Sequence, residues 1–66
     1  MFPNVRAEMG RKNITLEILS KEVGCTIGTL SLKLNGKYPI TLNEAKTIKK
    51  VLGVALPLEE LFEEAS

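Results

Sequence analysis

The sequence predicts a small all-α fold, a five-helix bundle that forms one domain over residues 1–66. Apolar residues recur at three- and four-residue spacing, as on one face of a helix, and no segment alternates for long enough to predict a strand. Glycine follows three of the apolar segments and threonine precedes three, and these residue types end and begin helices. The glycines are Gly24, Gly36 and Gly53, and the threonines are Thr15, Thr26 and Thr41.

The first helix is expected over residues 3–11, where Val5 and Met9 lie one turn apart on the inner face. The second and third helices are expected over residues 16–23 and 27–34, and a turn of about four residues joins them. These two helices contain the most informative part of the sequence.

The fourth helix is expected over residues 42–52, and Thr41 and Glu44 match a capping box at its start. Its buried stripe is formed by Ala45, Ile48 and Leu52. An extended connection precedes this helix and places Ile40 in the core. A short fifth helix is expected over residues 58–64, directly after a proline that suits a first helical turn.

The residue inventory excludes several classes of site. Cys25 is the only cysteine and histidine is absent, so we expect no internal disulfide, no metal and no cofactor, and we interpret Cys25 as a packed core residue. Aspartate and tryptophan are absent too, and there is no glycine-rich phosphate loop, so we expect neither catalytic residues nor a small-molecule ligand. No apolar run approaches a membrane span and the first residues lack a signal-peptide pattern, which predicts a cytoplasmic protein.

Charge is distributed unevenly along the chain. The net charge is +1, but residues 1–57 carry nine positive and four negative charges, a net charge of +5. The remaining acidic residues are Glu59, Glu60, Glu63 and Glu64. A basic body with an acidic end fits a surface that binds a polyanion, and it equally fits an ordinary solvated surface.

Residues 16–35 contain the pattern that predicts function. Ser20 is small enough for the next helix to cross close to it, and Gly24 permits a sharp exit from the first of the two helices. The inner stripes of the two helices are formed by Leu19, Val23, Leu30 and Leu34. Two helices that cross steeply let the second one project far enough to enter a DNA major groove.

At this point the sequence resembles the Cro/repressor-type helix-turn-helix domains, the lambda-repressor-like fold. The matching segments are Ile14-Thr15, Leu19-Ser20, Val23-Gly24-Cys25-Thr26, Thr29-Leu30-Ser31, Lys33-Leu34-Asn35-Gly36-Lys37, Thr41-Leu42, Leu52-Gly53-Val54 and Leu58-Glu59-Glu60-Leu61-Phe62. The resemblance covers nearly the whole chain, and it implies a DNA-binding domain whose third helix reads bases and which often forms a dimer.

The resemblance nominates residues for each role. The base-reading positions are Ile27, Gly28, Thr29 and Leu32. The positions near phosphates or the groove rim are Thr15, Leu16, Ser31, Lys33, Asn35, Lys37 and Tyr38, and we add Arg11 from its charge. Asn35 is equally suited to capping the third helix, and Tyr38 either stacks on Pro39 or reaches a phosphate.

Three departures from the family pattern concern these positions. Ile27 and Leu32 are apolar, and Gly28 has no side chain, where the family usually places polar or basic residues. Leu16 replaces a frequent glutamine, and Lys33 occupies a position that is more often apolar. Contact with thymine methyl groups and hydrogen bonds from Thr29 remain available for base readout.

A further apolar set exceeds what one short helix needs for docking. It consists of Val54, Leu56, Leu58, Leu61 and Phe62. We expect part of it to form a symmetric dimer contact, the alternative being that all five residues close the core. The sequence therefore predicts a DNA-binding transcriptional regulator, a phage-type repressor or Cro-like homodimer. The alternatives are a protein-interaction module on the same fold, and the DNA-binding part of an antitoxin or longer repressor.

Overall fold

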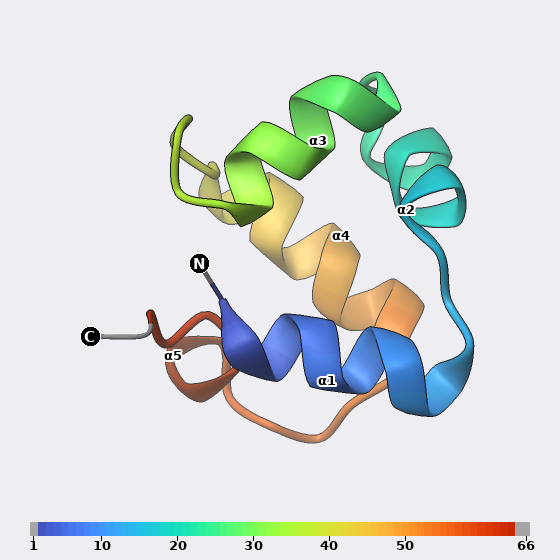
Figure 1. Ribbon diagram of the computed structural model, residues 1–66. Coiled ribbons are helices and arrows are strands. Elements are labelled where there is room, and N and C mark those ends of the chain that lie inside the picture. Colours follow the sequence, from blue (N-terminus) through green and yellow to red (C-terminus); the bar gives the residue numbers. More distant parts are fainter. Residues whose placement is uncertain (1, 65–66) are drawn as a thin grey trace.

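A computed structural model describes residues 2–64 of the chain, and over these residues it contains helices and no strands. The helices are α1 (Pro3–Lys12), α2 (Leu16–Val23), α3 (Ile27–Leu34), α4 (Leu42–Leu52) and α5 (Leu58–Leu61) (Figure 1). The predicted all-α fold is confirmed, and the predicted bounds of α2, α3 and α4 match the structure. None of the described helices is long and apolar enough to cross a membrane.

The two end helices differ from their predicted bounds. α1 continues to Lys12, and Asn13 ends it in the left-handed conformation (φ 56°), which residues other than glycine rarely adopt. α5 ends at Leu61 rather than at residue 64, so that prediction was wrong. The physical reason is charge, because Glu63 and Glu64 would face the partial negative charge at the C-terminal end of a longer helix.

Local capping fixes the starts of the three central helices. The hydroxyls of Thr15, Thr26 and Thr41 accept hydrogen bonds from backbone N–H groups in the first turns of α2, α3 and α4. At α4 the capping box is complete, because the Glu44 carboxylate also accepts from the Thr41 N–H at 3.0 Å. Each cap satisfies a donor that a helix start otherwise leaves unpaired.

One apolar cluster joins all five helices. Its completely or almost completely buried side chains are Val5, Leu19, Leu30, Leu34, Ile48, Leu52 and Leu61. Phe2 and Phe62 pack edge to face with ring centroids 5.3 Å apart and so connect the start of the chain to α5. Ile40 is half-buried and packs against this cluster, as predicted.

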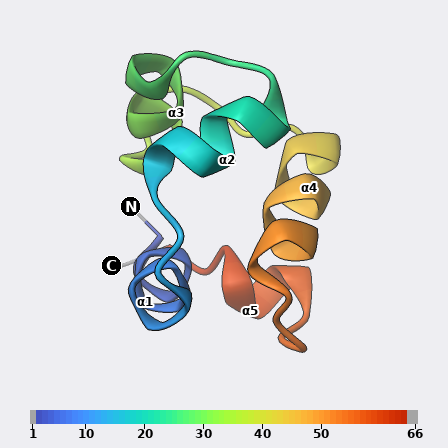
Figure 2. The same ribbon diagram turned by 90° about the vertical axis from the view of Figure 1, so that its right-hand side faces the viewer.

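The arrangement of the helices separates two sides of the molecule. In both views α3 lies at the top and α1 at the bottom, with α2 beside α3 and with α5 beside α1 (Figures 1 and 2). α4 packs against both groups. α2 and α3 therefore form one end of the molecule, and the surface there is separate from the surface that α1 and α5 form at the other end.

Candidate nucleic-acid interface

The turn between α2 and α3 is built around Ser20. This side chain is 4% exposed, and its hydroxyl donates to the Glu17 carbonyl at 2.9 Å, so its small polar group is satisfied inside α2. The Ser20 carbonyl accepts from the N–H groups of Gly24 and Cys25 at 2.8 and 3.0 Å. Gly24 has a φ of 88°, which strains residues with a side chain, so glycine is what makes this exit possible.

α3 presents one side to the core and leaves the other uncovered. Leu30 and Leu34 are buried, whereas Ile27 and Leu32 are 45% and 38% exposed. Gly28 is exposed as well, and a Cβ placed there would meet no atom within 4 Å. The outer side of α3 is therefore not covered by the rest of the chain. It presents aliphatic side chains and, at Gly28, an accessible backbone.

Thr29 is half-buried and already has local partners. Its N–H donates to the Thr26 hydroxyl at 3.2 Å, and the Thr26 hydroxyl donates to the Thr29 hydroxyl at 2.9 Å. The Thr29 hydroxyl proton is not used by either bond and is free to donate to an acceptor outside the chain.

Lys33 does not lie on the outer side of α3. Its ammonium is paired with the carboxylate of Glu44 on α4, and the two side chains are only 17% and 20% exposed. The hydrogen bond from Lys33 and then that from the Thr41 backbone lower the pKa of Glu44. The charge of Lys33 is therefore neutralised within the chain, which makes Lys33 a weak candidate for the predicted phosphate contact. Leu34 makes the core contact in its place.

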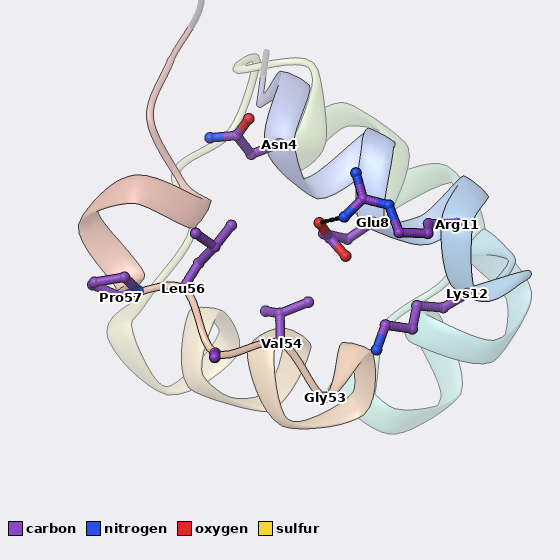
Figure 3. A pocket seen from close by; sticks show the side chains of 9 residues that line it. Asn4, Glu8, Arg11, Lys12, Gly53, Val54, Leu56 and Pro57 are labelled. Atoms are coloured by element: carbon purple, nitrogen blue, oxygen red, sulfur yellow. Dashed lines mark hydrogen bonds and ion pairs between the residues drawn. The ribbon is translucent and has the colours of Figure 1, made fainter.

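Arg11 also has a different position from the one predicted. Its guanidinium donates to the Glu8 carboxylate at 2.7 Å, and both side chains line a groove between α1 and residues 53–57 (Figure 3). That groove lies at the lower side of the molecule, away from α3, so Arg11 does not belong to the same surface.

α1 instead sends Arg6 towards α3. The Arg6 guanidinium donates to the Asn35 side-chain oxygen at 3.2 Å, at the C-cap of α3. Asn35 is thus the C-cap residue of α3, one of the two roles expected for it, and its contact with DNA stays a prediction. Twenty-nine residues separate this pair, and no local pattern in the sequence predicts it.

The remaining predicted contacts flank α3. Thr15 is exposed at the start of α2, and Lys37 and Tyr38 are exposed in the connection after α3, whereas Ser31 is half-buried. Leu16, predicted near a phosphate, lies at the start of α2, where its half-buried side chain packs against the core. Ile18 on α2 is 45% exposed and was missed, because an apolar residue in a helix is expected to face inward.

The predicted dimer set divides between core and surface. Leu61 has no exposed surface, so the prediction that it contacts a second copy is wrong. The half-buried members are Val54, Leu56, Leu58 and Phe62. Val54 and Leu56 face the groove that contains Arg11 and Glu8 (Figure 3).

Comparison with protein families gives one match. A family model described as Cro/C1-type HTH DNA-binding domain matches residues 4–63 and so includes all of α2, the turn and α3. Curated proteins and solved structures give no match. Over the described residues, no group of three histidine, cysteine, aspartate or glutamate side chains is placed to hold a metal ion.

Proposed function

This chain belongs to the Cro/C1-type HTH DNA-binding domain family, and on that premise we propose that it is a sequence-specific transcriptional regulator of the phage repressor or Cro-like type. It acts in the cytoplasm and binds a near-palindromic duplex site as a homodimer. The observation that carries the proposal is the uncovered outer side of α3, where Ile27, Gly28 and Leu32 are exposed.

α3 inserts into the major groove, which is about 12 Å wide and admits one helix. Ile27 and Leu32 contact thymine methyl groups, and the free hydroxyl proton of Thr29 is donated to a base acceptor. The missing side chain of Gly28 lets the backbone of α3 approach the base edges closely. A site rich in A·T pairs fits these contacts best.

Contacts to the DNA backbone hold α3 in register. Thr15 lies at the start of α2, and Lys37 and Tyr38 lie in the connection after α3, so phosphates are bound on both sides of the helix. These contacts fix position and supply affinity without sequence information. Bound in this way at a promoter, the protein represses by occupying the site that polymerase needs.

The dimensions of the chain agree with a dimer on DNA. Recognition helices in successive major grooves lie about 34 Å apart, so each α3 must lie about 17 Å from the two-fold axis. The molecule measures 25 × 24 × 20 Å. An interface that leaves α3 uncovered therefore allows the required separation.

The test is a fluorescence-anisotropy titration of a duplex selected from a random pool, with a random duplex as reference. Lys37→Ala is expected to weaken binding to both duplexes and to reduce the slope of log K against log salt by about 1, because one phosphate contact is lost. Lys12→Ala is the matched control, since Lys12 is an exposed lysine on α1, away from α3. If Lys37→Ala changes neither affinity nor slope, the backbone contacts are assigned wrongly.

The apolar outer side of α3 supports a second candidate, a protein-interaction module that binds through Ile27 and Leu32. This candidate predicts no binding to random duplex even at low salt. The same titration separates the two functions.

A further inference from the structure

A groove lined with lysines lies at the C-terminal half of α4. Lys46, Lys49 and Lys50 surround it, and Val54 and Leu58 provide its apolar part. The ion pairs over residues 2–64 are Arg11–Glu8, Lys21–Glu17 and Lys33–Glu44, so none of these three lysines has a carboxylate partner there.

A second groove lies next to it and has the opposite charge. Glu59 and Glu64 stand at its edge, and its apolar lining is formed by Phe2, Pro39, Ile40, Leu42, Leu58 and Phe62. Leu42 is the most exposed large apolar side chain described in the chain, at 62%. Neither glutamate has a cationic partner within the described residues.

The two grooves share Leu58 and therefore adjoin on the face that α4 and α5 form together (Figure 2). A two-fold axis that passes beside Leu58 exchanges the grooves. It brings the lysines of each copy against Glu59 and Glu64 of the other copy, so that the same charged contact forms twice. Neutral apolar surface lies between the two charged contacts, as the centre of a protein interface requires.

We propose that a second copy of the chain binds to this face. The lysines of α4 in one copy then form ion pairs across the interface with Glu59 and Glu64 of the other copy. The proposal rests on the homodimer of the proposed function and gives that dimer a surface and a charge pattern. It also replaces part of the predicted contact set, because Leu61 is buried and Leu56 faces a different groove.

Charge complementarity favours a second copy over DNA as the occupant of the lysine groove. Glu59 and Glu64 line the groove that adjoins the lysine groove at Leu58, and they would repel a phosphate backbone. A stable interface buries about 800 Å² on each partner, which is about a fifth of the 4234 Å² of accessible surface on this chain.

The experiment reverses the charges of each groove in the whole chain. One variant carries Lys46→Glu and Lys50→Glu, and the other carries Glu59→Lys and Glu64→Lys. All four positions are exposed, so circular dichroism should show both variants folded. Each variant alone should dimerise at least about tenfold more weakly than the wild type, because like charges then meet across the axis.

An equimolar mixture of the two variants should recover dimers, and native mass spectrometry should show that they contain one copy of each. A control with Lys12→Glu and Lys21→Glu makes the same change in net charge on other surfaces and should dimerise like the wild type. Two results overturn the proposal: variants that dimerise normally alone, or a mixture that stays monomeric while the wild type dimerises.

A wild type that is monomeric on duplex DNA also overturns it, together with the proposed homodimer. A fluorescence-anisotropy titration with random duplex at low salt measures DNA binding independently of dimerisation, so it tests the DNA-binding function separately. Charge-reversed monomers that still bind random duplex leave that function intact, whereas loss of binding by the wild type refutes the function itself.

Discussion

Replacing Glu44 should show how firmly α3 is attached to the rest of the domain. One oxygen of this carboxylate accepts from the Thr41 N–H at 3.0 Å, and the other pairs with the ammonium of Lys33 on α3. Both side chains of the ion pair are mostly buried, so water screens the pair less than it screens an exposed one. Glu44 therefore stabilises the start of α4 and the position of α3 at the same time.

The magnitude follows from these two bonds. Glu44→Ala removes a hydrogen bond of a capping box, about 0.5–1 kcal/mol, and a hydrogen bond between charged groups, about 1.5–3 kcal/mol. We expect the free energy of unfolding to fall by about 2–4 kcal/mol, a large part of what a small domain has. Glu44→Gln keeps one acceptor oxygen, for either Thr41 or Lys33, and replaces the other with an NH2 donor. It therefore loses the charge and one of the two hydrogen bonds, so its cost should be about 1–2 kcal/mol.

The assay is urea unfolding followed by circular dichroism at pH 7. With a slope of about 1 kcal/mol per M, the midpoint should fall by about 2–4 M for Glu44→Ala and by about 1–2 M for Glu44→Gln. Glu22→Gln is the matched control, because Glu22 is an exposed glutamate of α2 for which the structure shows no ion pair over residues 2–64. It should change the midpoint by less than about 0.5 M.

The pH dependence provides the result that would refute the reasoning. The pKa of Glu44 is lowered in the folded protein, chiefly by the hydrogen bond from Lys33, from its ordinary value of 4.5. The stabilisation by its charge is therefore present above pH 4.5 and is lost as the pH falls through the folded-state pKa. The difference in unfolding free energy between wild type and Glu44→Gln should shrink below pH 4.5. A difference that stays constant from pH 7 to pH 3 would show that the ion pair does not contribute.

Two further predictions use matched positions. Gly28→Ala and Gly10→Ala should each raise the free energy of unfolding by about 0.5–1 kcal/mol, because both glycines are in helices and an added Cβ meets nothing within 4 Å. Only Gly28→Ala should weaken binding to the selected duplex in an anisotropy titration, and equal affinities would place Gly28 outside the interface. Leu61→Ala should lower the free energy of unfolding by about 2–5 kcal/mol in urea titrations. Leu56→Ala should lower it by less than half of that amount, because Leu56 is only half-buried. Equal costs would contradict the assignment of Leu61 to the core.

The features that the sequence predicts are local ones. The three threonine caps and the glycine at the end of α2 act within four residues of their partners, so the bounds of α2, α3 and α4 follow from the chain alone. The stripe of Leu30 and Leu34 follows in the same way from helical periodicity. Together, these patterns predict that α3 is the helix whose outer side is left uncovered.

The features that the sequence does not predict depend on how helices meet. Lys33 pairs with Glu44 across eleven residues and Arg6 with Asn35 across twenty-nine, and either partner has several candidates in the sequence. α5 has only four residues, too few for a periodic pattern to distinguish buried Leu61 from half-buried Leu58.

The ion pair of Lys33 has a consequence for the proposed recognition of DNA. Lys33 is the only cation of α3, and Glu44 neutralises it, so α3 enters the groove without a net positive charge of its own. The attraction to phosphate then comes from cations that flank α3, such as Lys37 in the connection after it and Arg6 at its C-cap. The side chains that we propose to face the bases are aliphatic or hydroxylic, and salt does not screen their contacts. In the proposed complex, affinity and sequence preference therefore depend on different residues. Raising the salt concentration should weaken the contacts of Lys37 with every DNA sequence, and it should leave the preference of α3 for thymine methyl groups unchanged.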